Sequence, residues 1–382
     1  MKTELCLFDR TLNLQRYPKR AQELLQAWDA GDEFIIKHVE EELNLEDNKN
    51  ILILNDNFGA LSCWFSEKHN VTMMTDSFVS QRGTLKNLQR NQCNRVQLIS
   101  STEEMPQGFD LVIMQIPKNN RMLAWQLQQL RQSMTAECPI IAVNKAKEIH
   151  SSTLEVFEDY LGETKTSLAW KKHRLVFSNA NATNPLTIAE AVCWSVDNED
   201  IDLLNYPNVY SGERLDQGAR FMLEHIPVDA ELRHIIDLGC GNGVLSVKAA
   251  QLNPEARITC IDESFMAVES ARRNLEVNLG KERQFQFIAN NCLDGFKKHS
   301  SYLVLCNPPF HQGQAVTDHI AWQMFCDAKH ILCKEGKLLV IGNRHLDYDD
   351  KLCRLFGEEN VTTIASNSKF VILEAVKAEK SK

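Results

Sequence analysis

The chain has 382 residues, 43% of them hydrophobic and 24% charged, which is typical of a globular protein long enough for two domains. No apolar run is long enough to cross a bilayer, and the N-terminal segment MKTELCLFDR lacks the apolar core of a secretory signal. These features exclude membrane-spanning and secreted classes, so we expect a cytoplasmic protein with no membrane partner.

The net charge and the spacing of the cysteines limit the kinds of ligand and partner that we expect the chain to bind. A formal net charge of −9 gives no overall basic surface for phosphates, although a local basic face can exist beside an acidic remainder. The twelve cysteines form no C-x-x-C pair, so we expect reduced thiols and no metal site. Four of them, Cys63, Cys193, Cys260 and Cys306, lie in apolar runs and are expected to be buried.

Three patterns occur in the first half of the chain and return in the same order in the second half. The first is an apolar run, a small polar turn and the start of an amphipathic helix. The second is a strand, an acidic residue with Ser-Phe, and a helix with Asn near its end, and the third is another strand. The paired segments are 51–65 with 234–248, 71–91 with 258–278, and 109–119 with 301–311.

Each half alternates short apolar strands with helices, which predicts a mostly parallel, doubly wound sheet. In the second half the expected strands are HIIDL, RITCID, QFQFIA, YLVLCN and KLLVIGN. The tail VTTIASNSKFVILEAVK is expected to form an antiparallel hairpin at the sheet edge. We therefore predict an α/β protein of two tandem Rossmann-like domains, residues 1–188 and 189–382, the second ending in a hairpin as class I methyltransferases do.

A glycine loop follows the first strand of the second half, with the order Asp237-Leu238-Gly239-Cys240-Gly241-Asn242-Gly243. Ligands bind beyond the carboxyl ends of parallel strands, where glycines let the backbone approach them. Dinucleotide sites have the spacing G-x-G-x-x-G, whereas D-x-G-x-G-x-G resembles the first motif of S-adenosylmethionine enzymes. We expect Asp237, Gly239, Gly241, Asn242 and Gly243 to bind the cofactor.

Two further positions support that cofactor. Asp262 ends the next strand, where a carboxylate can accept hydrogen bonds from both ribose hydroxyls. Asn291 follows the third strand, where contacts to the adenine edge are expected.

The tetrad Asn307-Pro308-Pro309-Phe310 follows the fourth strand, and N-P-P-[YFW] at that place is typical of methyltransferases that act on planar nitrogens. The lone pair of such a nitrogen is delocalised, so acceptors aimed at its N–H groups favour attack. We expect the Asn307 side-chain oxygen and the Pro308 carbonyl to be those acceptors. Two prolines make the turn rigid, and Phe310 offers a face for the base, with Pro309 beside the substrate.

The chain resembles the tandem-domain bacterial rRNA guanine-N2 methyltransferases, and in particular the large-subunit family RlmG. The stretches that carry this resemblance are 51–63, 145–172, 307–325, 342–352 and 355–377. It implies S-adenosylmethionine-dependent methylation of the N2 of one guanine in 23S rRNA. One departure is Tyr210, where the family has phenylalanine, while Leu215, Asp216 and Gly218 fit the family pattern.

The first half has lost the residues of this chemistry. Aligned on Leu61 and Leu245, Ile53 stands at Asp237, and Asn55 and Asn57 replace Gly239 and Gly241. Ile116-Pro117-Lys118 is set against Asn307-Pro308-Pro309, and Asp76 lies near the Asp262 position. We expect this domain to bind no cofactor and to serve as an rRNA-binding platform.

Substrate contacts are expected from basic residues. Lys171 and Lys172 lie beside Trp170, a pattern suited to phosphates and a stacked base. Arg344 and His345 follow the fifth strand of the second half and are better placed to meet the substrate.

Several alternatives remain open at this level. The acceptor could be a guanine of 16S rRNA, an adenine, or a glutamine amide of a protein. A non-catalytic ribosome-assembly factor and a nucleotide-dependent oxidoreductase are alternatives from other classes, and the intact Asn307 and the missing G-x-G-x-x-G argue against them. We expect a monomer acting on free or partly assembled 23S rRNA.

Overall fold

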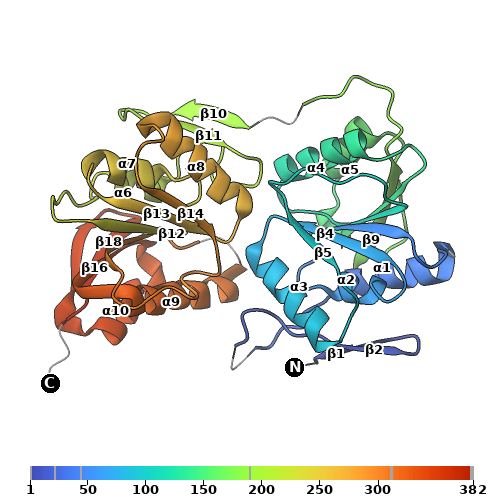
Figure 1. Cartoon of the computed structure of the whole chain (residues 1–382), viewed down its shortest axis with the longest axis horizontal. Coiled ribbons are helices and arrows are strands. Elements are labelled where there is room, and N and C mark those ends of the chain that lie inside the picture. Colours follow the sequence, from blue (N-terminus) through green and yellow to red (C-terminus); the bar gives the residue numbers. More distant parts are fainter. Residues whose placement is uncertain (1, 21–22, 44, 189–190, 310–312, 379–382) are drawn as a thin grey trace. The chain divides into compact units, whose positions relative to one another are not determined.

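The computed structural model describes residues 2–20, 23–43, 45–188, 191–309 and 313–378, with no side-chain description for 313–317. The chain divides into two compact units, Met1–Glu190 and Ala191–Lys382. Each unit is built around a seven-stranded mixed sheet with helices on both faces (Figure 1). The predicted fold class is confirmed.

The N-terminal unit follows the order expected for a doubly wound sheet. Its strands are β1 (Glu4–Leu7), β2 (Arg10–Asn13), β3 (Asn50–Leu54), β4 (Asn70–Thr75), β5 (Gln97–Ser100), β6 (Leu111–Gln115), β7 (Pro139–Lys145), β8 (Lys165–Thr166) and β9 (His173–Asn179). Its helices are α1 (Ala30–His38), α2 (Ala60–Phe65), α3 (Phe78–Arg90), α4 (Asn120–Ser133) and α5 (Ser151–Leu161), with shorter turns at Val39–Leu43 and Ala146–Glu148.

The sheet of this unit has the strand order β5-β4-β3-β6-β7-β9-β8, in which β8 and β9 are antiparallel to their neighbours. The central strand Ile51–Leu54 is fully buried, as an apolar run in a sheet covered on both faces should be. Helices α1, α2 and α3 pack on one face, and α4 and α5 on the other (Figure 1).

The C-terminal unit repeats this plan. Its strands are β10 (Val192–Ser195), β11 (Asp202–Asn205), β12 (His234–Leu238), β13 (Arg257–Asp262), β14 (Phe285–Ala289), β15 (Ser301–Cys306), β16 (Leu332–Asn343), β17 (Val361–Ser366) and β18 (Phe370–Val376). Its helices are α6 (Gln217–Leu223), α7 (Val244–Leu252), α8 (Phe265–Leu279), α9 (Gly313–Ile331) and α10 (Tyr348–Phe356), with short turns at Arg344–Leu346 and Glu358–Asn360.

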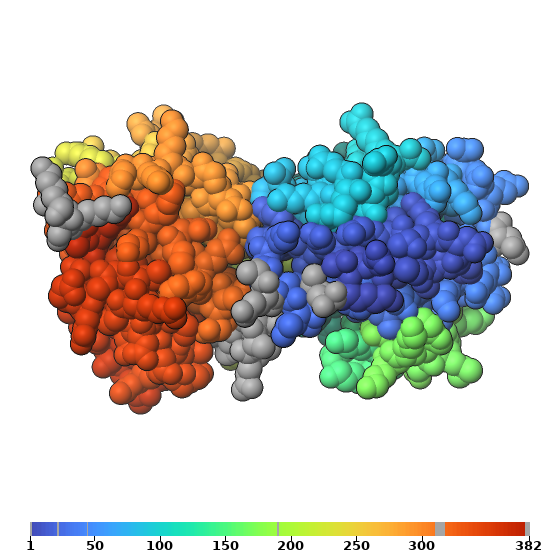
Figure 2. Space-filling view, turned by 90° about the horizontal axis from the view of Figure 1, so that it is seen from below, coloured from blue at the N-terminus to red at the C-terminus, as the bar shows by residue number. Residues whose placement is uncertain are grey.

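Its sheet order, β14-β13-β12-β15-β16-β18-β17, matches that of the first unit strand for strand. The hairpin β17–β18 closes the sheet at one edge, as the sequence predicted. Helices α6, α7 and α8 cover one face, and α9 and α10 cover the other (Figure 1). Figure 2 shows the second of these faces, covered by the orange and red segments that contain α9 and α10.

Each unit also contains a two-stranded hairpin ahead of its sheet, β1–β2 in one and β10–β11 in the other. These hairpins were not predicted from the sequence. In the view of Figure 2 the dark-blue N-terminal residues cover part of the first unit. Hydrogen bonds from Asn13 and Gln15 to α3 fix this segment on the unit.

Within the described residues, no helix is long and apolar enough to span a membrane.

Candidate active site at the carboxyl edge of the C-terminal sheet

Strands β12, β13, β15 and β16 run parallel, so the residues that follow them meet at one edge of the sheet. Asp237 lies near the end of β12, Asp262 ends β13, and Asn307 follows β15 directly. A Cβ built on Gly239 would lie 3.9 Å from the carbonyl oxygen of Asn307. The glycine loop and the start of the Asn-Pro-Pro-Phe tetrad are therefore neighbours in space, although 64 or more residues separate them along the chain.

The glycine loop is fixed to β13 through its backbone. The amides of Gly239 and Cys240 donate to the Ile261 carbonyl at 2.8 and 2.9 Å. The Gly241 amide donates to Asp262 Oδ2 at 2.9 Å. A Cβ on Gly241 would meet nothing within 4 Å, whereas one on Gly243 would lie 2.8 Å from the Ala271 Cβ. Gly241 thus faces open space, and Gly243 lets the loop pack closely on α8.

Asp262 stands where the sequence placed a ribose-binding carboxylate. Its Oδ1 accepts the Ser264 amide at 3.0 Å and its Oδ2 accepts the Gly241 amide. These hydrogen bonds tie the carboxylate at the end of β13 to the glycine loop and to the start of α8.

Asp237 is 1% exposed and accepts a hydrogen bond from the Ser246 hydroxyl at 2.7 Å. Burial raises the pKa of this carboxyl to about 6, while its hydrogen bonds from Ser246 act in the opposite direction. These hydrogen bonds connect β12 to Ser246 of α7, the helix that follows the glycine loop.

Asn242 and Asn291 use their side chains within the protein. The Asn242 Nδ2 donates to Asn205 Oδ1 at 2.9 Å, and its Oδ1 accepts the Val244 amide at 3.2 Å. The Asn291 Nδ2 donates to Asp294 Oδ2 at 2.7 Å. Both residues are expected from the sequence to bind the cofactor, and in the structure both side chains have partners within the protein.

Asn307 has one end of its amide anchored and the other free. Its Nδ2 donates to Asp216 Oδ2 at 3.5 Å. Its Oδ1 is buried and has no hydrogen-bond partner within the described ranges. Because a buried acceptor without a partner is costly, this oxygen is suited to a ligand N–H. Pro308 is buried and Pro309 partly exposed, and Phe310 lies outside the described residues.

Asp216 is a site residue that the sequence analysis noted only as a family match. It caps α6 by accepting the Ala219 amide at 2.9 Å through the same Oδ2 that faces Asn307. The hydroxyl of Tyr210 also hydrogen-bonds to Asp216, and burial raises the pKa of this phenol. Tyr210, the one departure from the family pattern, thus adds a donor to the carboxylate that orients Asn307.

Asn343 was missed altogether. It ends β16, is 8% exposed, and its Oδ1 has no partner within the described parts of the chain. Leu305 and Ile341 share one core cluster with α6, and side chains alternate along strands, so Asn307 and Asn343 point to that same face. The signal for this residue in the sequence was a polar side chain at the end of an apolar strand.

The charges at this edge suit a cationic ligand. Asp216, Asp237 and Asp262 gather around the loop and the tetrad. Opposite charge favours binding in a partly buried site, so these residues, the open space at Gly241 and the unpartnered Asn307 Oδ1 fit the sulfonium cofactor S-adenosylmethionine.

The expected substrate-contact residues are spread over both units. Arg344 and His345 are exposed in the turn that follows β16, at the same edge as Asn307. Lys171 and Lys172 belong to the N-terminal unit, where they form the turn between Trp170 and His173. Lys171 pairs with Glu33 at 2.8 Å and lies 4.5 Å from the centre of the Trp170 ring. That ring is thus already covered by a cation.

The N-terminal unit has side chains where the C-terminal loop is open. The Asn55 Nδ2 donates to the Gln115 carbonyl and to Gln126 Oε1, both at 2.9 Å. Asp56 is 1% exposed and accepts the Gly59 amide at 3.0 Å and the Ser62 hydroxyl at 2.8 Å. Through these hydrogen bonds the side chains of the loop are held within the unit, where the C-terminal loop has glycines.

Strand register corrects one detail of the sequence alignment. Ile113 pairs with Ile53, and Leu305 pairs with Asp237, the residue equivalent to Ile53. Two residues further along each strand, Gln115, and not Ile116, therefore stands at the Asn307 position. Met73 pairs with Ile53, and Cys260 pairs with Asp237. Two residues further along, Thr75 therefore stands at the Asp262 position, and Asp76 follows it. The match of Ile116 with Asn307 was therefore wrong by one residue, although the paired segments 109–119 and 301–311 already place Gln115 there, whereas Asp76 does lie near the Asp262 position, one residue further along.

The cysteines were expected to be reduced, and four of them buried, without a metal site. The cysteines are free, and Cys63, Cys260 and Cys306 are buried as expected. Cys193 is exposed, so its predicted burial was wrong, because it lies on the small hairpin outside the main sheet. No group of three or more metal-binding side chains occurs in the part of the chain that the structure describes.

Comparison with known sequences gives matches to both units. Residues 2–182 match the family described as the RLMG N-terminal domain, and residues 200–374 match the methyltransferase small domain. A protein of Aliivibrio fischeri (strain MJ11) named ribosomal RNA large subunit methyltransferase G is 94% identical over 382 residues, the whole of both chains. The protein of the same name from Vibrio cholerae (strain O395) is 61% identical over 99% of this chain and all of its own length.

Among solved structures, the T. thermophilus 16S rRNA N2 methyltransferase RsmC, determined in complex with AdoMet and guanosine, has a TM-score of 0.78. The match covers 98% of this chain and 97% of that one at 18% identity. At this level of identity the likeness concerns the fold alone, and it extends over both units.

Proposed function

The chain belongs to the ribosomal RNA large subunit methyltransferase G family, and we propose that it methylates the exocyclic N2 of a guanine in 23S rRNA. The family resemblance seen in the sequence is confirmed, and the protein is an S-adenosylmethionine-dependent methyltransferase. The observation that carries the choice of a planar nitrogen is Asn307, whose amide nitrogen is held by Asp216 while its oxygen is buried without a protein partner in the described chain.

The catalytic residues we propose are Asn307, Pro308 and Phe310. The Asn307 Oδ1 and the Pro308 carbonyl accept the two N–H bonds of the amine, which turns its lone pair toward the methyl group. Phe310 stacks on the base, and Pro309 lies beside it. S-adenosylmethionine, when bound, supplies a methyl group on a sulfonium, which is a good leaving group. The protein's task is then alignment, and the proton leaves to solvent without a strong general base.

The cofactor residues we propose are those of the glycine loop with Asp262. Gly239, Gly241 and Gly243 bring the backbone close to the ligand, and Asp262 accepts the ribose hydroxyls. Asp237, Asn242 and Asn291 shape the site through their internal hydrogen bonds. Their contribution is to hold the loop and the end of β14 rather than to contact the cofactor through free side chains.

For the N-terminal unit, residues 1–188 in the sequence-based division, we propose a non-catalytic role as an rRNA-binding platform. The filled loop around Asn55 and Asp56 supports the loss of cofactor binding. Lys172 is exposed and Lys171 is paired with Glu33, so Lys172 is the better phosphate contact. Arg344 and His345 are proposed to contact RNA beside the active site. We propose a cytoplasmic monomer that acts on free or partly assembled rRNA without a metal.

The test is transfer of a tritiated methyl group from S-adenosylmethionine to rRNA extracted from a strain that lacks this gene, followed by nucleoside analysis. Label in N2-methylguanosine of the large-subunit rRNA, lost in Asn307→Ala, is the expected result. Label in small-subunit rRNA, in adenosine or in protein glutamine would overturn the substrate. Cofactor binding without transfer to any acceptor would favour a ribosome-assembly factor.

A further inference from the structure

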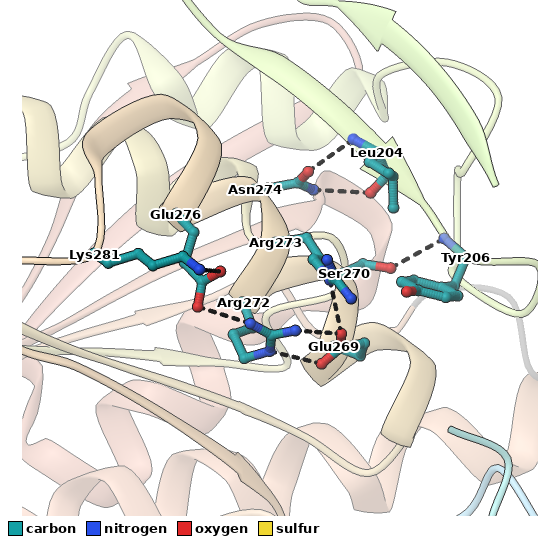
Figure 3. Close-up of polar contacts among 9 residues, drawn as sticks. All are labelled: Leu204, Tyr206, Glu269, Ser270, Arg272, Arg273, Asn274, Glu276 and Lys281. Carbon is teal, nitrogen blue, oxygen red and sulfur yellow. Dashed lines mark hydrogen bonds and ion pairs between the residues drawn. The ribbon is translucent and has the colours of Figure 1, made fainter. Parts of the chain in front are cut away.

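Helix α8 holds the small hairpin β10–β11 through side chains four residues apart. The hydroxyl of Ser270 accepts the Tyr206 amide at 3.0 Å, and Asn274 Oδ1 accepts the Leu204 amide at 2.7 Å (Figure 3). The Asn274 Nδ2 donates back to the Leu204 carbonyl at 3.0 Å (Figure 3). Every fourth helix residue thus meets every second residue of the strand segment.

A third rung continues the pattern. Asn278 Oδ1 accepts the Asp202 amide at 2.9 Å, and its Nδ2 donates to the Asp202 carbonyl at 2.8 Å. Four helical residues rise about 6 Å, and two strand residues rise about 6.6 Å. The two spacings agree closely enough for a straight ladder between the helix and the hairpin.

The outer side of α8 is stiffened by ion pairs. Arg272 contacts Glu269 at 2.6 Å and Glu276 at 2.7 Å, and Arg273 contacts Glu269 at 3.0 Å (Figure 3). Pairs at this spacing contribute only a few tenths of a kcal/mol each. Their effect is to keep the ladder side chains on one regular helix.

Asn274 differs from the other rungs because it also reaches the glycine loop. Its Nδ2 donates to the carbonyl oxygen of Asn242 at 2.8 Å. Asn242 in turn donates from its side chain to Asn205, the residue that ends β11. Asn274 is 1% exposed and Asn205 fully buried. The peptide between Gly241 and Gly243 is therefore tied to both the helix and the hairpin.

The N-terminal unit has the same ladder without a cofactor loop. Asn87 exchanges hydrogen bonds with Gln15 at 3.0 and 2.9 Å and donates to the Phe58 carbonyl at 2.7 Å. Asn91 exchanges hydrogen bonds with Asn13 at 2.7 and 2.8 Å. The ladder by itself therefore serves folding, and it provides a control within the same chain.

We propose that Asn274 is a positioning residue for S-adenosylmethionine, which sets the orientation of the Asn242 peptide and thereby the backbone at Gly241. This inference rests on the proposed placement of the cofactor at the glycine loop. Asn278 serves the hairpin alone, because its bonds end on Asp202 and on its own helix. The Asn205 end of the hairpin is then part of the support of the cofactor site, whereas the Asp202 end, which Asn278 holds, is not.

The experiment compares Asn274→Asp, Asn278→Asp and Asn87→Asp in the full chain. Each change keeps an acceptor, removes the amide donor and adds a carboxylate, so the two control variants also carry the added charge. We expect the dissociation constant and KM for S-adenosylmethionine to rise about tenfold in Asn274→Asp, the effect of one lost buried hydrogen bond. The kcat at saturating cofactor should change much less. The other two variants should lower the melting temperature and leave cofactor affinity within about twofold.

Unchanged cofactor affinity in Asn274→Asp, or an equal loss in Asn278→Asp, would overturn the proposal. If Asn274→Asp does not fold, Asn274→Ser is measured in the same way, and the same outcomes apply. If the unmodified protein and Gly241→Ala bind S-adenosylmethionine equally well, the placement of the cofactor at the glycine loop is refuted instead. Binding without methyl transfer to rRNA would refute the proposed substrate and leave the role of Asn274 standing.

Discussion

Gly241 and Gly243 lie two residues apart in one loop, and alanine at each position should have different consequences. Both have left-handed backbones, with φ of 52° and 77°, which costs an alanine about 1–2 kcal/mol. At Gly241 the added methyl group meets nothing within 4 Å, so this backbone term is the whole cost to stability. The methyl group would, however, enter the space where we propose that the cofactor lies.

At Gly243 the methyl group would lie 2.8 Å from the Ala271 Cβ and 2.9 Å from its Cα. Overpacking against a helix backbone adds about 1–3 kcal/mol, so Gly243→Ala should destabilise the C-terminal unit by about 2–5 kcal/mol in total. For a unit of this size each kcal/mol lowers the melting temperature by about 2–4 °C. Gly241→Ala, which has only the backbone cost, should melt about 2–8 °C below the unmodified protein and lose most of its cofactor affinity.

The assay is thermal unfolding together with calorimetric titration of S-adenosylmethionine. Hydrogen exchange of the β12 and β13 amides would report the C-terminal unit separately from its neighbour. Equal stability of the two variants would refute the packing argument. If Gly241→Ala binds S-adenosylmethionine with normal affinity, the cofactor does not lie in the open space at Gly241.

In the first unit, Gly59 has φ of 83° and a Cβ there would lie 2.8 Å from the Thr84 Cα. Gly59→Ala should therefore be as costly as Gly243→Ala without any effect on cofactor.

Three further changes test the site. Asp216→Ser keeps a helix cap but cannot reach Asn307, so kcat should fall about tenfold or more with the melting temperature unchanged, and the loss of one carboxylate should weaken cofactor affinity less than it lowers kcat; an unaltered kcat would contradict its positioning role. The folded pKa of Asp237, about 6 against 3.8, means that the C-terminal unit gains stability as pH falls from 6 toward 4. Asp237→Asn should remove this dependence in melting curves and stabilise the unit at pH 7 by up to roughly 3 kcal/mol. Lys172→Ala should weaken rRNA binding and reduce the salt slope of the affinity by about one, more than Lys171→Ala does.

The duplication, the fold class and the main positions of the candidate site could all be predicted from the amino-acid sequence. Apolar runs at regular spacing predict parallel strands whether or not their neighbours are known, because a sheet covered on both faces requires them. The order of Asp237, the glycines and Asn307 along the chain then places them at the ends of neighbouring strands. Gly59 stands at the position of Gly243 in the alignment on Leu61 and Leu245, and its close approach to Thr84 gives the physical reason for a glycine there.

The roles of individual side chains, in contrast, depend on contacts that form when separate elements pack together. Hydrogen-bond partners such as Asp216 for Asn307, or Asn274 for the Asn242 carbonyl, lie 91 and 32 residues apart in sequence. No local pattern specifies such pairs, because a side chain's partner depends on how separate elements pack. The strand register also decides which residue stands at the Asn307 position. Gln115 lies there, as the paired segments 109–119 and 301–311 imply, because the register of a buried strand is set by pairing with its neighbours.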